Sequence, residues 1–290
     1  MPELPDLLYI RKYLDREVRG SVITDAIVRR PLVLRITLDR PFAEIVRHHT
    51  IDAMDIHGPF LRFALSGDIE LLVNLMLAGR LQHQRPGEKA EGYVCCSLVL
   101  QDESRLHLCD PDTMAKMYIV RAGDYASVPR YREQGVDILS PAFTPAVFME
   151  IARRNSRRQV RVFINDHTML SSIGNAYADE VLFEARIHPK TFVGRLDVRA
   201  LEVLYHAILS VMEEGARKVE EARQPIQVKV RDHMKVRNRK GDPCPRCGAT
   251  IRREGVRGYD VFFCPACQAA TRNHFINWGP PGGGPSGRES

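Results

Sequence analysis

The sequence predicts an α+β protein: an N-terminal β-sandwich with flanking helices, then a helical domain, then a zinc ribbon. Three observations support this fold class. Short strand-like segments dominate residues 22–119, helix-like segments dominate residues 141–223, and two Cys-x-x-Cys pairs follow near the C-terminus. Several short strands at this spacing are typical of a sandwich or barrel, and paired Cys-x-x-Cys motifs are typical of a zinc site.

The strand-like segments are rich in β-branched, aromatic and other apolar residues and are separated by turn residues. They read LVLRITL, FLRFAL, YVCCSLVL and RLHLC, at residues 32–38, 60–65, 93–100 and 105–109. Gly67-Asp68 stands between two apolar runs, which favours a hairpin. A helix is expected before the strands, over residues 4–18. We therefore assign residues 1–130 to a domain of the β-sandwich type.

Helical segments replace the strands near Pro141. Thr144 is a favoured N-cap residue and Pro145 a favoured first helical residue, so a helix is expected to begin there. Three more helices are expected, at residues 160–166, 175–185 and 197–223. Residues 141–225 thus read as a helical domain.

The chain after the helical domain changes character twice. Residues 226–272 combine a basic connector with the cysteine segment. The Gly- and Pro-rich tail, residues 273–290, has too few apolar side chains to form a core, so we expect it to be disordered.

Composition and charge narrow the class of protein. The 290 residues suffice for two domains with their own cores, and 44% of them are hydrophobic. No apolar run reaches the length of a membrane span and no signal-like segment follows Met1, so we expect a cytoplasmic protein. Lys plus Arg exceed Asp plus Glu by only 42 to 36. The position of the basic residues is therefore more informative than their number.

The four C-terminal cysteines have the spacing of a metal site. Cys-x-x-Cys occurs twice with sixteen residues between the pairs, at Cys244, Cys247, Cys264 and Cys267. Four thiolates complete a tetrahedral shell without an open position, so the site predicts one structural Zn²⁺ and no metal catalysis. A redox dithiol would need only one pair. The other three cysteines lie in strand-like stretches and are expected to be buried apolar residues.

The N-terminus offers a second functional pattern. Pro2 and Glu3 begin the segment PELPD. If Met1 is removed, Pro2 exposes a secondary amine with a reference pKa of roughly 7.7–8.0, which can attack a sugar carbon to form an iminium ion. Glu3 could then transfer protons. Without a catalytic role, the same segment would be only a rigid start to a helix.

Basic residues gather in two places that favour a phosphate backbone. Five arginines lie within nine residues, at Arg153, Arg154, Arg157, Arg158 and Arg161. The next segment, Ser172 to Asn175, is a turn into a helix, and the N-terminus of a helix binds phosphate through its free N–H groups. Six further cations occupy the connector, at Lys229, Arg231, Lys235, Arg237, Arg239 and Lys240.

Three motifs in this order resemble the Fpg/Nei family of DNA glycosylases. They are the Pro-Glu-Leu-Pro start, the segment Gly-Asn-Ala-Tyr-Ala-Asp-Glu from Gly174, and the four-cysteine finger. The resemblance implies a catalytic sandwich, a helix–two-turn–helix domain and a zinc finger, in a monomer that binds damaged DNA. It implies that Pro2 and Glu3 are catalytic and that Asn175 and Arg239 contact phosphates. Arg161 stands where the family commonly has a DNA-binding Lys.

The sequence departs from the family at the positions that open and read the base. Pro59 stands where a hairpin Lys is usual, and His57 nearby is a candidate to compensate. Leu77 takes the place of a Met that fills the gap left by the flipped base.

The loop after Asp110 and the finger hairpin also differ from the family. Thr113 stands where the family has an Arg, although Met114 can still add apolar bulk. Tyr259 stands where the finger hairpin has an Arg, and Arg257 is the candidate to replace it.

Three functions remain open at this point. The first is a base-excision-repair DNA glycosylase with abasic-site lyase activity, acting through a Schiff base on Pro2. The second is a glycosylase-like protein that binds damaged or unusual DNA, double- or single-stranded, without excision of the common oxidised purines. The third, a zinc ribbon on an RNA-processing or translation factor, leaves the N-terminal motif unexplained. Because flipping a paired base costs a few kcal/mol, the altered wedge favours damage that is already unstacked.

Overall fold

The computed structural model describes residues 2–269, which form two compact units. Within that range, unit 1 comprises residues 2–143, 165–177 and 209–234, and unit 2 comprises residues 144–164, 178–208 and 235–269. The predicted helical domain is thus divided between the units, because residues 165–177 and 209–225 pack with the sandwich. The tail predicted to be disordered, residues 273–290, lies outside the described residues.

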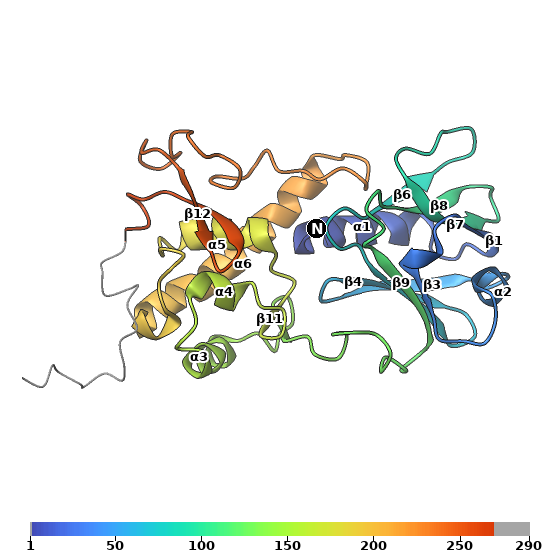
Figure 1. Cartoon of the computed structure of the whole chain (residues 1–290), viewed down its shortest axis with the longest axis horizontal. Helices are drawn as coiled ribbons and strands as arrows, with labels where there is room; N and C mark the ends of the chain where they lie inside the picture. Colours follow the sequence, from blue (N-terminus) through green and yellow to red (C-terminus); the bar gives the residue numbers. More distant parts are fainter. Residues whose placement is uncertain (1, 270–290) are drawn as a thin grey trace, which may run out of the picture. The chain divides into compact units, whose positions relative to one another are not determined.

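Two sheets form the β-sandwich of unit 1 (Figure 1). The first has the order β1-β7-β8-β6, with bounds Ile23–Val28, Val94–Leu100, Arg105–Cys109 and Arg80–Gln84. The second has the order β2-β9-β5-β4-β3, with bounds Leu34–Ile36, Lys116–Arg121, Ile69–Asn74, Phe60–Leu65 and Ile51–His57. Neighbouring strands are antiparallel except β2 and β9.

One hydrophobic core lies between these elements. Side chains from both sheets contribute to it, among them Ile23, Leu71 and Leu98, which are at most 2% exposed. Helix α1 (Leu4–Glu17) adds Leu7, Ile10 and Leu14 to the same cluster at helical spacing. Truncation of one such buried Leu to Ala costs about 2–5 kcal/mol. The N-terminus is therefore fixed to the sandwich by its first helix.

The predicted strands of unit 1 are confirmed with one difference. β4 and β8 have the predicted bounds, and Gly67 and Asp68 form the predicted hairpin with positive φ angles of 73° and 59°. The segment predicted as a strand over residues 32–38 instead begins as a 3-10 turn at Pro31, and only Leu34–Ile36 pairs in the sheet. Proline fixes φ and has no N–H to donate to a sheet, which explains the late start.

The helices that follow the sandwich strands also agree with the predictions. They are α3 (Pro145–Arg154), α4 (Val160–Ile164), α5 (Asn175–Glu184) and α6 (Val198–Glu221). The N-cap Thr144 accepts a hydrogen bond from Val147 N at 3.3 Å, as predicted. Helices α5 and α6 each have one end in unit 1. No helix within residues 2–269 has the length and apolar character that a membrane span needs.

The cysteine segment contains a short hairpin. Strands β12 (Arg252–Val256) and β13 (Tyr259–Phe263) are antiparallel, with Val256 opposite Tyr259. The two-residue turn between them, Arg257-Gly258, has positive φ at both positions, which is the geometry of a tight hairpin turn. The predicted ribbon hairpin is therefore present.

Candidate active site and zinc centre

Pro2 and Glu3 lie together at the start of α1, and both are buried. The Glu3 carboxylate, 6% exposed, accepts two backbone hydrogen bonds: Ala176 N donates to Oε1 at 2.9 Å and Tyr177 N to Oε2 at 3.0 Å. Burial raises the pKa of Glu3, although these two donors and Arg231 act in the opposite direction. The carboxyl group therefore keeps its proton to a higher pH than an exposed Glu.

The N-terminus of α5 holds Glu3 instead of a phosphate. Its first residues were predicted to bind DNA phosphate, because free N–H groups and the helix dipole attract anions. In the structure, the N–H groups of Ala176 and Tyr177 already bind the Glu3 carboxylate. The prediction that these N–H groups bind an anion is thus right, but for Ala176 and Tyr177 the anion is the Glu3 side chain and not a DNA phosphate.

Gly174 is required by this contact. A Cβ atom added at Gly174 would lie 2.3 Å from the Glu3 carboxyl carbon, which is far closer than any real contact. The glycine before α5 therefore lets the backbone approach Glu3. The sequence shows the glycine, but only the fold shows that its partner is the N-terminal Glu, 171 positions earlier in the chain.

Asp6 links α1 to the basic connector. Its carboxylate accepts the backbone N–H of Glu3 at 2.8 Å, and Arg231 pairs with both of its oxygens, at 2.8 and 2.6 Å. The Arg231 guanidinium also lies over the Tyr177 ring, 5.6 Å from its centroid. Tyr177 in turn contacts His233 through its hydroxyl at 3.0 Å. Arg231, predicted to contact phosphate, is therefore held by an internal carboxylate.

Two further cations lie near Asp6: Lys229, one of the connector cations predicted to contact phosphate, and Arg80, which the sequence did not single out. Arg80 donates to the backbone oxygens of Ala78 and Gly79. Lys229 Nζ lies 3.5 Å from the backbone oxygen of Leu77. Burial lowers the pKa of Lys229, and the positive charges of Arg80 and Arg231 contribute in the same direction. The connector thus places a lysine beside the loop that carries Leu77.

The β3–β4 hairpin, which carries a Lys in the family, presents Pro59 here. Gly58 and Pro59 form its two-residue turn, and Gly58 accepts a hydrogen bond at its oxygen from Ser172 Oγ at 3.0 Å. His57 Nε2 lies 2.7 Å from the backbone oxygen of Tyr131, and the centroids of the two rings are 4.3 Å apart. His57 is therefore a positioned aromatic residue, and its role as a substitute for the Lys stays a prediction.

The two predicted gap-filling residues are exposed at the tips of loops. Leu77 is 57% exposed and follows Met76, which has a positive φ of 49°. Met114 is 38% exposed in the loop between β8 and β9. The fully buried Asp110 holds that loop, because its carboxylate accepts N–H groups of Asp112 and Ala115. Both apolar side chains are thus accessible to a ligand.

Arg161 does not lie where a DNA contact requires it. Its side chain is fully buried, and its Nε pairs with the fully buried Asp179 at 2.9 Å. Asp179 also binds Arg237 at 2.7 Å, and Tyr259 places its ring 5.5 Å from the Arg161 guanidinium. The prediction that Arg161 contacts DNA therefore disagrees with the structure, because a buried ion pair already uses its charge.

Glu180, the neighbour of Asp179, fixes the basic connector. Its carboxylate accepts the backbone N–H groups of Lys235, Val236 and Arg237, at 2.8–2.9 Å. Burial raises the pKa of Glu180, and these three donors counteract that shift. The acidic pair of the helix motif therefore organises unit 2, a role that the motif alone did not indicate.

The remaining predicted DNA-binding residues keep partly or fully exposed positions. Asn175 is the first residue of α5 and is half-buried. Arg239 is half-buried in the connector, and Arg257 is exposed at the tip of the β12–β13 hairpin. Asn175 belongs to unit 1, whereas the two arginines belong to unit 2. Their phosphate contacts stay a prediction.

The four predicted zinc ligands converge. The Sγ atoms of Cys244, Cys247, Cys264 and Cys267 all lie within 4.8 Å of one another. Two of these separations are 3.9 Å and 3.5 Å, close to the ~3.8 Å expected between sulfurs of a Zn²⁺ tetrahedron with bonds of about 2.3 Å. The backbone N–H groups of Arg246 and Cys267 point at two of the sulfurs, as thiolates require. The finger holds one structural zinc.

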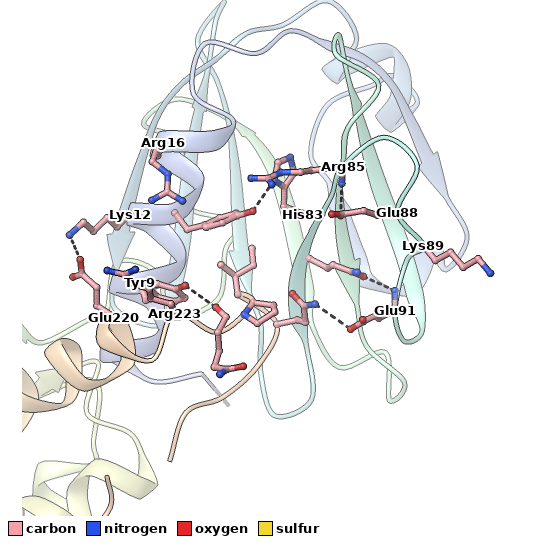
Figure 2. Close-up of a pocket in the computed structure, with 16 residues that line it drawn as sticks. Tyr9, Lys12, Arg16, His83, Arg85, Glu88, Lys89, Glu91, Glu220 and Arg223 are labelled. Carbon is pink, nitrogen blue, oxygen red and sulfur yellow. Dashed lines mark hydrogen bonds and ion pairs between the residues drawn. The ribbon is translucent and has the colours of Figure 1, made fainter. Parts of the chain in front are cut away.

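A pocket of about 940 Å³ in unit 1 does not belong to this site. It lies between α1, β6 and the end of α6, and its lining carries charges of both signs (Figure 2). Lys12 pairs with Glu220, and Gln227 donates to Glu91. None of the predicted catalytic or DNA-binding residues lines this pocket.

The sandwich with its N-terminal proline and buried carboxylate, together with the helical unit and its four-cysteine finger, defines a DNA glycosylase. Three family models match the chain. The formamidopyrimidine-DNA glycosylase N-terminal domain matches residues 1–117, the H2TH domain of the same enzyme matches residues 134–225, and the zinc finger found in FPG and IleRS matches residues 241–270. The chain therefore belongs to the formamidopyrimidine-DNA glycosylase (Fpg) family.

Individual relatives agree with this assignment. The formamidopyrimidine-DNA glycosylase of Thermus thermophilus is 31% identical over 278 residues, which covers 92% of this chain and 98% of the relative. That of Pelotomaculum thermopropionicum is 29% identical and covers 92% and 99%. The crystal structure of the T. thermophilus MutM (Fpg) protein has a TM-score of 0.81 over 93% of this chain and all of its own. A Lactococcus lactis Fpg complex, 21% identical with a TM-score of 0.84, supports the fold.

Proposed function

We propose that this chain is a base-excision-repair DNA glycosylase with abasic-site lyase activity, and that Pro2 is its nucleophile. The observation that carries the proposal is the position of Glu3, a buried carboxyl group directly beside Pro2 and held by two backbone donors. Membership of the Fpg family, whose N-terminal domain model matches residues 1–117, supports the same activity.

The chemistry follows from these two residues. After removal of Met1, the Pro2 nitrogen attacks C1′ of the damaged nucleotide, and the bond from C1′ to the base breaks. An α-amine has a reference pKa of roughly 7.7–8.0, so part of the Pro2 nitrogen is unprotonated and nucleophilic near neutral pH. Glu3, with its raised pKa, donates a proton during opening of the sugar or departure of the base. The resulting iminium ion then permits elimination of the phosphates on both sides.

We further propose that Lys229 supplies the positive charge that the family hairpin lacks at Pro59. Lys229 lies beside the Leu77 loop, and Arg80 and Arg231 surround the same region. A phosphate bound here would favour the charged ammonium form of Lys229 and so offset the burial and the positive neighbours that lower its pKa. The charge would therefore come from the connector instead of the β3–β4 hairpin.

The substrate preference follows from the loops. Leu77 and Met114 offer apolar bulk, but neither can pair with an orphaned base. We therefore propose that the enzyme acts best on bases that are already unstacked, as in single-stranded or mismatched DNA, because the cost of flipping is then small. A Lactococcus lactis Fpg structure was solved with DNA containing an abasic site, a lesion at which no base has to be flipped.

The remaining expectations concern the state of the protein. We propose that it acts as a monomer in the cytoplasm, at the nucleoid through its DNA contacts. Asn175, Arg239 and Arg257 would contact phosphates, with His57 as a further candidate. Arg161 is left out of this set because it is buried in an ion pair.

The proposal is tested with a panel of oligonucleotides that carry an oxidised purine, an oxidised pyrimidine or an abasic site, each in single-stranded and duplex form. We expect cleavage of at least one substrate, with the highest single-turnover rate where the lesion is unstacked. Lys229→Ala should reduce the rate at least tenfold and leave the melting temperature unchanged. Lys240→Ala, an exposed connector lysine, is the matched control.

Tight binding to the whole panel without any product would support the second function instead. In that case the protein is a glycosylase-like module that recognises damaged DNA. The replacement of the hairpin Lys by Pro59 is the specific observation that favours this alternative. Pro59→Lys would then be expected to restore excision.

A further inference from the structure

A second polar pocket lies on the four-stranded sheet of unit 1, apart from the Pro2 site. Its volume is about 610 Å³, and residues of β6, β7 and β8 and the segments that follow β1 and precede β7 line it. Its charged lining residues are Arg29, Arg30 and Arg105. None of the site residues described above contributes to it.

The three arginines have no ion-pair partner in the described part of the chain. No ion pair among residues 2–269 includes any of them, and no Asp or Glu side chain lines the pocket. The backbone N–H groups of Arg29 and Arg30 both donate to the Cys95 oxygen, at 2.9 and 3.0 Å. The backbone of the two neighbouring arginines is therefore held at a fixed point on β7, and no carboxylate among residues 2–269 forms an ion pair with their side chains.

The floor of the pocket is neutral. The side-chain amide of Gln84 donates its N–H to the backbone oxygen of Glu88 at 2.6 Å. The Gln84 Oε1 atom therefore faces His107 Nε2, also at 2.6 Å. Nε2 must then carry the proton, and Nδ1 accepts from Ser97 Oγ at 2.7 Å. Burial, Arg105 and Arg29 together lower the pKa of His107 to about 4. His107 therefore adds no positive charge near neutral pH, and its pKa responds to the charges of Arg105 and Arg29.

An aromatic surface completes the pocket. Tyr93 is 40% exposed, and the Arg30 guanidinium lies over its ring, 4.9 Å from the centroid. Exposed tyrosines next to arginines stack on bases while the arginines bind the phosphate. The pocket in Figure 2 differs, because Glu220 and Glu91 lie among its cations.

We propose that this pocket binds the phosphate group of a nucleotide, with Arg29, Arg30 and Arg105 as ligands and the Tyr93 ring as a stacking surface. The phosphate belongs either to a free nucleotide or to a DNA strand outside the lesion site. Both sources present the same chemistry to the pocket. The site would allow the enzyme to hold a nucleotide or a second stretch of strand without involving Pro2.

The test uses His107 as a local reporter in the full-length protein labelled at histidine nitrogens. Adenosine 5′-monophosphate, inorganic phosphate and an undamaged six-nucleotide DNA strand are titrated separately at low salt. We expect a saturable shift of the His107 resonances, which His107→Gln identifies by their loss. A bound phosphate should also raise the pKa of His107 from about 4. The readout does not depend on base excision, so it is independent of the proposed enzymatic function.

Arg29→Ala/Arg105→Ala should weaken the binding at least tenfold. The matched control is Arg19→Ala/Arg47→Ala, which removes two exposed arginines of the same unit and should change the affinity less than twofold. A response to the strand alone identifies a backbone phosphate as the ligand. A response to the mononucleotide or phosphate alone identifies a free phosphate monoester. No saturable His107 shift with any probe, or equal weakening in both double variants, would overturn the proposal.

Discussion

Glu3 is placed where one side chain affects three parts of the protein. It precedes α1, lies next to Pro2, and binds the first N–H groups of α5. Its protonated form is favoured by burial, while its ionised form is favoured by the backbone donors. A carboxyl group balanced in this way can give up and regain a proton during a reaction, which is what base departure and ring opening require.

Glu3→Gln should reduce base excision by about 10²–10⁴-fold, because the amide cannot transfer the proton. The fold should be retained, since glutamine has the same length and still accepts one of the two backbone hydrogen bonds. Single-turnover excision and the melting temperature measure the two effects. Excision within threefold of the parent protein would show that Glu3 is not the proton donor.

The pH dependence of excision follows from the same pKa. The raised pKa of Glu3 means that the protonated carboxyl group persists above its ordinary range near 4.5 and is lost as the pH rises through the raised value. The excision rate should therefore fall on that alkaline limb, and Glu3→Gln should remove the limb. The protonated form of Glu3 also contributes to the stability of the folded protein, and this contribution is lost as the pH rises through the raised pKa.

Helix α5 shows how one element serves two units. Its first N–H groups bind Glu3 in unit 1, whereas Asp179 and Glu180, one turn later, bind arginines and backbone N–H groups in unit 2. The sequence alone supported a DNA-binding role for this helix. The structure shows that its acidic residues fix the connector and the finger hairpin.

Asp179→Asn should destabilise unit 2 by about 3 kcal/mol, because it leaves the buried Arg161 without its counter-charge. The matched control is Asp260→Asn in the β12–β13 hairpin. Asp260 pairs with Arg253, but both side chains are about half exposed, so the cost should be below about 1 kcal/mol. Urea unfolding of both variants measures the difference. Equal stabilities would contradict the buried ion pair.

The finger should bind one zinc ion per chain, measured by elemental analysis. Chelation, or Cys247→Ser, should release the metal and remove hydrogen-exchange protection from β12 and β13, because the ribbon has only a small apolar cluster of its own. Cys109→Ser, in the buried β8, should keep the zinc. A finger that stays protected without metal would argue against a structural role.

At the scale of the whole molecule, the sequence predicted the elements better than their packing. Apolar runs between turn residues predicted β4 and β8, the Thr144-Pro145 cap predicted α3, and the spacing of the cysteine pairs predicted the β12–β13 hairpin, because local residues determine these elements. The cysteine spacing predicted the zinc site for the same reason. Arg161 could not be placed in this way, since its partner Asp179 is 18 positions away and burial, not residue type, decides its role.

The candidate site shows the same limit. Pro2 and Glu3 follow from the N-terminal motif, but the partners of Glu3 and Asp6 come from distant segments at residues 176–177 and 231. Lys229 was predicted only as one of six connector cations, and its position beside the Leu77 loop comes from the fold. The three arginines of the nucleotide pocket likewise come from β8 and from the segment after β1, which the fold brings together.

The most direct test of the central claim is borohydride trapping of the full-length protein on an oligonucleotide with one abasic site. Mass spectrometry first confirms that Met1 is absent. The account predicts a covalent adduct with the parent protein and none with Pro2→Gly, while both bind the DNA equally. An adduct of equal yield in Pro2→Gly, or none in the processed parent protein despite tight binding, would contradict Pro2 as the nucleophile.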